Sequence, residues 1–147
     1  MKKISLFLAA LLISIFSAYA DSDRITHDIN ELPEKSRLFL STYYKNIPIS
    51  HIKIEKNLLW IESYDVILTN GTNIEFERSG EWKEVKGSPE HIPSTIIQAF
   101  IHDYVNQHYA GTQISGVDRS GQHIEIDLNN GIELTFDTEG HIIDIDR

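Results

Sequence analysis

The chain has 147 residues, no cysteine and a net charge of −9 at pH 7 with histidine neutral. Without cysteine there can be no disulfide and no thioether-linked lipid anchor, and the acidic balance disfavours binding to nucleic acid or anionic lipid. The length is that of one ordinary domain, which can bury a sizeable core without covalent cross-links.

Residues 1–20 have the pattern of a secretory signal peptide. Two lysines precede an apolar stretch at residues 4–16, and Ala18 and Ala20 form a small-x-small cleavage pattern. The apolar stretch is too short to span a bilayer comfortably as a helix. Cleavage would remove two of the 13 basic residues, leaving 11 against 22 acidic ones and a net charge of −11. We expect a periplasmic or secreted protein with no membrane insertion after cleavage.

The rest of the chain divides into a polar segment and two similar units. Residues 21–31 are polar and expected to be loose, and residues 86–91 read as a linker. Sliding residues 32–87 over residues 92–147 without a gap aligns two prolines, two Asn-Gly dipeptides and two Phe-x-x-x-Gly patterns. A fixed offset without an insertion indicates a duplicated supersecondary unit.

Each unit is predicted to begin with a helix. Pro33 and Pro93 suit the first turn of a helix, because the missing N–H would have no intrahelical partner there. Pro48 ends the first helix. The apolar residues that recur at helical spacing, and so predict a buried stripe, are Leu40, Tyr43, Tyr44 and Ile47 in the first unit and Ile96, Ile97, Phe100, Ile101 and Tyr104 in the second.

An Asn-Gly dipeptide marks a β-hairpin in each unit, at residues 70–71 and 130–131. A set of even-numbered apolar residues lies on both sides of the first dipeptide, namely Trp60, Tyr64, Val66 and Leu68 before it and Ile74 and Phe76 after it. A two-residue loop would turn the second strand's apolar face away from that of the first. A three-residue loop with glycine in the left-handed conformation pairs Val66 with Ile74 instead. The second unit follows the same register, so each hairpin has one apolar face.

A weaker strand precedes each hairpin and a short strand follows it. These strands are expected near residues 52–54 and 82–85 in the first unit, and near residues 114–117 and 142–145 in the second. Each unit is therefore predicted to be a helix followed by four antiparallel strands, which is an α+β arrangement.

One pattern of residues spans both units, and its Pro, Asn-Gly, Phe and Gly positions recur at the same offset. Its residues are Leu32, Pro33, Asn70, Gly71, Phe76, Gly80 and Trp82 in the first unit and Pro93, Asn130, Gly131, Phe136 and Gly140 in the second. This pattern resembles the PepSY-like family of bacterial periplasmic proteins, also described as β-lactamase-inhibitor-like. The resemblance implies a tandem repeat that forms one continuous, curved eight-stranded sheet with both helices on one side, and it implies no enzymatic activity. The second unit departs from the pattern at Ile142, where the first has Trp82.

No catalytic or metal-binding signature accompanies this pattern. The seven histidines never occur at His-x-x-x-His spacing, and neither a Gly-x-Ser-x-Gly motif nor a glycine-rich phosphate loop is present. Residues 136–140 (FDTEG) superficially resemble a calcium loop, but the acidic periodicity and the distal glutamate are missing, so we interpret them as a turn. We expect no catalytic residue, no metal site and no cofactor.

The sheet face opposite the core is predicted to be acidic. The hairpin register sets Asp65 across from Glu75, and directly opposed like charges cost a few tenths of a kcal/mol up to about 1 kcal/mol. This face is either a solvated surface in an acidic protein or a surface kept for a basic partner. The candidate binding residues are Asp65, Glu75, Glu77, Trp82, Glu125, Asp127, Glu133 and Asp137.

The two tryptophans differ in what the sequence predicts. Trp60 shares the even numbering of the core residues and is expected to be buried, whereas Trp82 suits a core anchor and an interface hot spot equally. The leading function is an exported, non-enzymatic binding or inhibitory module that engages an unidentified basic periplasmic or secreted protein through a sheet face. The alternative is a cation- or metal-responsive protein that uses the acidic face, and a hydrolase is disfavoured by the absence of motifs.

Overall fold

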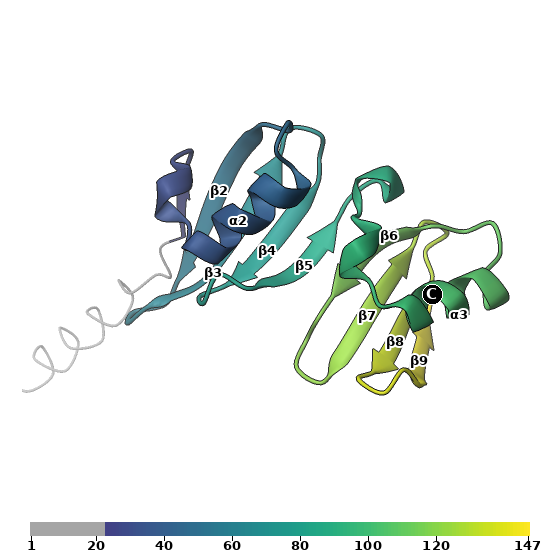
Figure 1. Ribbon diagram of the computed structural model, residues 1–147. Coiled ribbons are helices and arrows are strands. Elements are labelled where there is room, and N and C mark those ends of the chain that lie inside the picture. The colour runs from purple at the N-terminus through teal and green to yellow at the C-terminus, as the bar shows by residue number, and fades with distance from the viewer. Residues whose placement is uncertain (1–22) are drawn as a thin grey trace, which may run out of the picture.

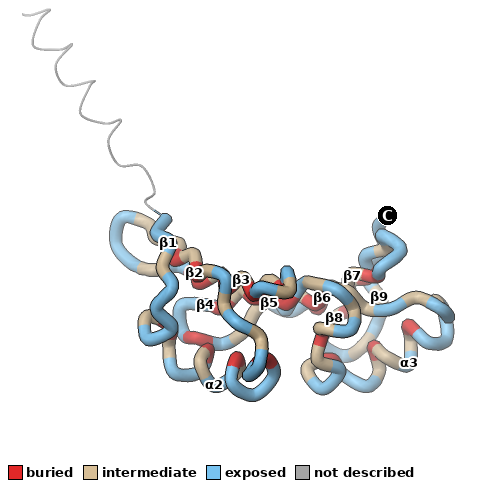
Figure 2. Tube along the Cα trace, turned by 90° about the horizontal axis from the view of Figure 1, so that it is seen from above, coloured by how far each residue is buried: buried red, intermediate tan, exposed pale blue. Residues whose placement is uncertain are grey.

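A computed structural model describes residues 23–147, so the predicted signal peptide lies outside the described residues. One antiparallel sheet of nine strands runs in chain order from β1 to β9, and two α-helices pack on it (Figure 1). Figure 2 shows both helices on the same face of the sheet. This is the α+β class that the sequence predicts. In the part of the chain that is described, no helix has the length and apolar character needed to cross a membrane.

The order of elements is a helix followed by four strands, twice, after one short extra strand. The strands are β1 (Arg24–Thr26), β2 (Ile49–Lys56), β3 (Ile61–Leu68), β4 (Asn73–Glu77), β5 (Trp82–Lys86), β6 (Ile114–Asp118), β7 (His123–Leu128), β8 (Glu133–Asp137) and β9 (Ile142–Asp146). The helices are α2 (Glu34–Tyr43) and α3 (Ala99–His108), and the 3-10 turns are η1 (Ile29–Glu31), η2 (Pro89–His91) and η3 (Ser94–Ile96).

The N-terminal segment, expected to be loose, supplies the extra strand. β1 pairs antiparallel with β2, placing Arg24 opposite Ile54. An ion pair between Arg24 and Glu31 connects β1 to η1, and the carboxylate of Asp28 accepts the backbone N–H of Asn30 at 2.9 Å. The sheet therefore has nine strands rather than the expected eight. Hydrophobic periodicity misses β1 because three residues at a sheet edge bury little apolar surface.

The predicted hairpin register is confirmed in both halves. Val66 pairs with Ile74 in β3–β4, and Ile126 pairs with Leu134 in β7–β8. The loop glycines adopt left-handed φ angles of 86° and 85°. All four paired side chains have 0% exposure, so the alternation of apolar and polar residues assigns one strand face to the core.

Replacement of Gly71 by alanine should lower the free energy of unfolding by about 1–2 kcal/mol, because an L-residue is strained at this φ. No heavy atom lies within 4 Å of the added Cβ, so backbone strain is the whole effect. Urea denaturation measures the loss, with Thr69→Ala in the same exposed loop as the control. Equal stability of the two variants would show that the loop tolerates a different conformation.

The core forms between the helices and the apolar face of the strands. Phe39 of α2 contacts Phe76 of β4 with ring centroids 5.7 Å apart, and Tyr104 of α3 contacts Phe136 of β8 at 5.3 Å. Both pairs are edge-to-face, the arrangement that aromatic quadrupoles favour. Each helix thus covers the central hairpin of its own half.

The gapless offset of 60 residues fails for the helices. Phe76 and Phe136 are 60 positions apart, but α2 and α3 begin at positions 34 and 99, which are 65 apart. The helix predicted to begin at Pro93 instead begins after Gln98, because residues 94–96 form the 3-10 turn η3. The C-caps of the two helices, Tyr44 and Tyr109, are also 65 positions apart. The backbone N–H of each donates to the carbonyl four residues earlier, with an N···O distance of 2.8 Å. The two matching prolines are therefore not equivalent in structure.

The β2–β3 hairpin absorbs the difference of five residues. Ile52 pairs with Val66, 14 positions later, whereas Val117 pairs with Ile126, 9 positions later. Both hairpins close with a loop of four residues, so the first has longer strands and reaches further from the core.

Trp60 is exposed, contrary to the expectation from its even number. It lies in the loop at the end of this hairpin and exposes 48% of its surface. β3 begins only at Ile61, and a register shift separates Glu55 from Lys56 in the pairing with β3. Strand alternation therefore does not extend to Trp60, because a loop residue has no fixed face of the sheet.

Candidate binding surface on the sheet

The structure brings the predicted acidic pairs together on the sheet face that points away from the helices. Asp65 lies opposite Glu75 in β3–β4, and Asp127 lies opposite Glu133 in β7–β8. We call this surface the outer face. Glu125 lies on it as well, because its strand neighbours Ile124 and Ile126 are buried in the core.

Lysines that the sequence analysis overlooks are interspersed among these carboxylates. Lys83 pairs with Glu75 at 3.0 Å, and Lys86 reaches both Glu84 at 2.5 Å and Asp127 at 3.4 Å. Lys86 thereby connects the two halves of the outer face. Its hydrogen bond to Glu84, followed by the attraction of that carboxylate, raises the pKa of Lys86.

Lys53 of β2 is a third lysine on the outer face, and the sequence contains a signal for it. It lies between the buried residues Ile52 and Ile54, so the same alternation that predicts the core predicts its outward direction. The position of Lys83 could not be found in this way, because a register shift between β4 and β5 interrupts the alternation there.

The charge of Asp65 lies beside other carboxylates, and no neighbouring lysine forms a hydrogen bond with it. Burial, followed by the repulsion of Glu55 and Glu75, raises the pKa of Asp65 to about 6. The nearby lysines bond elsewhere, since Lys53 donates to Glu55 at 2.6 Å and Lys83 donates to Glu75 at 3.0 Å. Within residues 23–147 no side chain donates a hydrogen bond to Asp65. Its ionised form is therefore destabilising in the folded protein.

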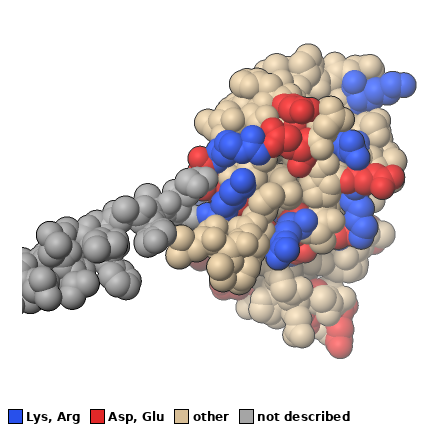
Figure 3. All heavy atoms as spheres, turned by 90° about the vertical axis from the view of Figure 1, so that its left-hand side faces the viewer, with Lys and Arg blue, Asp and Glu red and all other residues tan. Residues whose placement is uncertain are grey.

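The second half of the outer face carries less positive charge. Glu133 has Asp127 opposite it on β7 and Asp146 opposite it on β9. Burial, followed by the repulsion of Glu125 and Asp127, raises the pKa of Glu133. On the side of β1 and β2, by contrast, acidic and basic side chains alternate (Figure 3). The outer face of β6–β9 therefore groups acidic residues with fewer lysines among them than the outer face of the first half.

Asp137 is the last residue of β8, and its carboxylate caps the turn that follows. Its Oδ1 accepts the backbone N–H groups of Glu139 and His141, each at 2.9 Å, and its Oδ2 lies 2.9 Å from His141 Nδ1. These backbone and side-chain hydrogen bonds from His141 lower the pKa of Asp137, and the same contact raises the pKa of His141. Of the FDTEG residues, Phe136 and Asp137 end β8 and residues 138–140 form the turn, with Gly140 at φ 93°.

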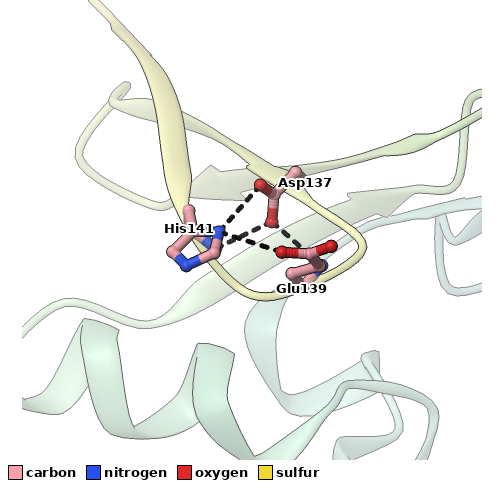
Figure 4. A group of neighbouring side chains, drawn as sticks. All are labelled: Asp137, Glu139 and His141. Carbon is pink, nitrogen blue, oxygen red and sulfur yellow. Dashed lines mark hydrogen bonds and ion pairs between the residues drawn. The ribbon is translucent and has the colours of Figure 1, made fainter.

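The same turn gathers one ligand atom from each of Asp137, Glu139 and His141 within 4.8 Å (Figure 4). His141 is not part of the FDTEG pattern, so the sequence analysis did not include it. Two carboxylates and an imidazole are compatible with a divalent cation. One oxygen of Asp137 already accepts two backbone N–H groups, and all three side chains lie at the surface, so the geometry by itself is also that of an ordinary capped turn.

Trp82 is a core-edge residue and lies on the helix side of the sheet. It is opposite Phe76, its ring lies 5.9 Å from that of Phe39, and the guanidinium of Arg119 stacks on it 3.7 Å from the ring centroid. Arg119 also donates a hydrogen bond to the backbone carbonyl of Trp82. Trp82 and the acidic residues therefore do not form one surface, and Trp82 lines a groove of about 330 Å³ beside α2.

Glu77, the remaining predicted residue, lies opposite Ser63 at the end of β4 and is exposed. Glu77 therefore lies at the edge of the outer face and not at its centre. Of the eight residues predicted for the site, the structure groups Asp65 and Glu75 in one half, and Glu125, Asp127 and Glu133 in the other.

Residues 62–144 match the model of a protein family described as "Putative beta-lactamase-inhibitor-like, PepSY-like". Three crystal structures are similar over most of the chain. A "putative periplasmic protein" of the DUF2874 family from Bacteroides vulgatus is 32% identical, with a TM-score of 0.76, 87% of this chain covered and 99% of that chain. A second Bacteroides vulgatus structure, described as a "putative periplasmic protein of unknown function", is 33% identical, with a TM-score of 0.79 and coverage of 86% and 100%.

The third structure comes from Bacteroides thetaiotaomicron and is described as a "putative calcium-regulated periplasmic protein". It is 31% identical, with a TM-score of 0.76 and coverage of 85% of this chain and 97% of that chain. Comparison with curated proteins gave no match.

Proposed function

The chain belongs to the PepSY-like, β-lactamase-inhibitor-like family, and from this premise we propose that it is an exported, non-enzymatic module that binds a basic periplasmic protein through the outer face of its sheet. Periplasmic location is supported by the descriptions of the similar structures and by the predicted signal peptide. A non-enzymatic role is supported by the family's inhibitor-like description and by the lack of catalytic motifs in the sequence.

The observation that carries the proposal is the energetic cost of the outer face. Asp65 is partly desolvated beside two further carboxylates, and Glu133 lies between two acidic residues on neighbouring strands. Opposed like charges destabilise a sheet, and threonine or lysine at these positions would relieve the repulsion. Retention of the carboxylates is explained if they meet a basic surface, where they would speed association and fix orientation.

We also propose that the two halves are copies of one unit, as the element order and the equivalent aromatic contacts support. Under this proposal the two copies differ in the charge of the outer face and in the length of one hairpin. The second copy carries the more acidic outer face, whereas the first carries the longer β2–β3 hairpin. The two halves would then serve different contacts.

Charge reversal on the second half of the outer face tests the proposed function. The immobilised double variant Glu125→Lys/Glu133→Lys should capture about tenfold less of the partner from periplasmic extract than the unmodified protein, and capture should fall as salt is added. The matched control, Glu90→Lys/Asp103→Lys, makes the same change in net charge at exposed positions away from the outer face. Equal losses in the two variants, or capture that is insensitive to salt, would contradict binding through this face.

Calcium responsiveness is the second candidate, because one similar structure is described as calcium-regulated and the β8–β9 turn gathers Asp137, Glu139 and His141. Under it, millimolar calcium raises the melting temperature. The rise should disappear in Asp137→Asn/Glu139→Gln if the turn binds the ion, and in Glu125→Gln/Glu133→Gln if the outer face does. A melting temperature that calcium leaves unchanged would remove this candidate.

A further inference from the structure

Three consecutive large apolar side chains lie in solvent at the end of the β2–β3 hairpin. Leu58, Leu59 and Trp60 expose 73%, 79% and 48% of their surfaces. Isolated exposed apolar residues are ordinary, but a contiguous apolar patch indicates a contact surface. We call residues 58–60 the apolar tip. The corresponding loop between β6 and β7 consists of Arg119, Ser120, Gly121 and Gln122, which are not apolar.

The tip is a turn in which several backbone polar groups bond within the hairpin. Asn57 Oδ1 accepts the backbone N–H groups of Leu59 at 2.8 Å and Trp60 at 3.0 Å, and the backbone N–H of Asn57 donates to the carbonyl of Trp60 at 3.1 Å. The amide of Asn57 in turn donates to Glu62 at 2.7 Å. Backbone groups that already have partners lower the penalty of moving the loop into an apolar medium.

The tip lies at the end of the sheet where the described chain begins. β1 runs antiparallel to β2, so its N-terminal end points toward the β2–β3 loop, and Asp23 pairs with Lys53 at 3.0 Å. Figure 1 shows β1 and this hairpin on the same side of the molecule. Only six residues separate Asp23 from the apolar stretch at residues 4–16, a span of about 20–25 Å when extended. Until the predicted cleavage, export through that stretch would bring this end of the protein close to the membrane.

We propose that the apolar tip contacts the surface of a zwitterionic lipid bilayer. Tryptophan is enriched at the level of the headgroups, and two leucines beside it can reach the acyl boundary. Lys56 and Glu62 flank the tip and have opposite charges, so no cluster of basic residues beside the tip favours anionic lipid. The net charge of −11 after the predicted cleavage, 11 basic against 22 acidic residues, adds a repulsion from anionic lipid. Three side chains bury less surface than an acyl chain, so the contact is reversible and differs from insertion of a spanning segment.

Vesicle flotation of the exported protein, purified from the periplasm, tests the contact. The protein should float with vesicles of phosphatidylcholine and phosphatidylethanolamine, and the triple variant Leu58→Ser/Leu59→Ser/Trp60→Ser should reduce the bound fraction about fivefold or more. The matched control is Ile143→Ser/Ile145→Ser, which removes apolar side chains with 49% and 50% exposure from β9. Both variants carry the same N-terminus, so any contribution from that segment cancels. Addition of phosphatidylglycerol should weaken the flotation of the unmodified protein.

Quenching of tryptophan fluorescence by brominated lipid identifies the residue at the bilayer. Trp60→Phe should keep flotation but lose the quenching, because the remaining Trp82 packs between Phe39 and Arg119. Absence of flotation by the unmodified protein, or equal flotation of the tip variant and the control, would overturn the proposal. So would sedimentation equilibrium that shows a dimer lost only in the tip variant without lipid binding, since the tip would then contact a second copy. None of these results depends on capture of a protein partner, so they leave the proposed outer-face function to its own test.

Discussion

Gly80→Ala is expected to lower the free energy of unfolding by about 3 kcal/mol, the largest loss among the glycine variants considered. Gly80 has a φ of +87°, where an L-residue is strained by about 1–2 kcal/mol. An added Cβ would also lie 2.6 Å from Pro33 Cβ and 3.2 Å from Ser36 Oγ. Such overpacking adds about 1–3 kcal/mol because α2 must move away from the β4–β5 turn.

Gly131→Ala is the matched control for this prediction. Its φ of +85° imposes the same backbone strain, but no heavy atom lies within 4 Å of the added Cβ. Urea denaturation should therefore show a loss of about 1–2 kcal/mol for Gly131→Ala and a larger one for Gly80→Ala. Gly80→Ala would also break the hydrogen bond of 3.1 Å from Ser36 Oγ to the carbonyl of residue 80. Equal losses would contradict the close packing of the helix N-terminus on this turn.

Asp65→Asn should stabilise the protein by about 1–2 kcal/mol at pH 8. The pKa of Asp65 is raised from 3.8 to about 6 in the folded protein, chiefly by burial. A full conversion of that shift would give about 3 kcal/mol, which we reduce because the carboxyl is still partly solvated. Asparagine has nearly the same shape without the charge, so it removes the cost of ionisation and keeps the packing.

The effect of Asp65→Asn has a defined pH dependence. Between pH 3.8 and about 6 the folded state binds more protons at this site than the unfolded state, so the contribution of Asp65 to stability falls as the pH rises through that window. The gap between the variant and the unmodified protein should be near zero below pH 4 and reach its full size above pH 6. Glu77→Gln, at the exposed end of β4, is the control and should change stability by less than about 0.5 kcal/mol. A gap of constant size from pH 4 to pH 8 would contradict the assignment of the titration to Asp65.

The hairpins, the class of fold and the acidic pairs could be predicted because they depend on local geometry. The numbering parity of apolar residues around each Asn-Gly dipeptide determines the loop length, and the loop length determines that Asp65 faces Glu75. These features need no knowledge of distant contacts. The family resemblance added the order of the strands and the common side of the helices.

The features that could not be predicted from the sequence depend on the different lengths of equivalent hairpins and on irregular strand pairing. The second helix begins after Gln98 rather than at Pro93 because residues 94–96 form a 3-10 turn, and the longer β2–β3 hairpin makes up the difference in offset. The same hairpin places Trp60 in a loop, where strand parity has no meaning. Lys83 reaches Glu75 only through a register shift between β4 and β5. One-dimensional patterns carry little information about such irregularities.

Site-specific cross-linking in intact cells tests most directly whether the outer face binds a periplasmic partner. The chain has no cysteine, so a single introduced cysteine is the only thiol of this protein that a thiol-reactive photo-cross-linker can label. Glu133→Cys places it on the exposed outer face, and Gln107→Cys places it on the exposed side of α3. We predict a discrete adduct with a partner protein from Glu133→Cys that is absent from Gln107→Cys. The same adduct from both variants, or an adduct from Gln107→Cys alone, would contradict binding through the outer face.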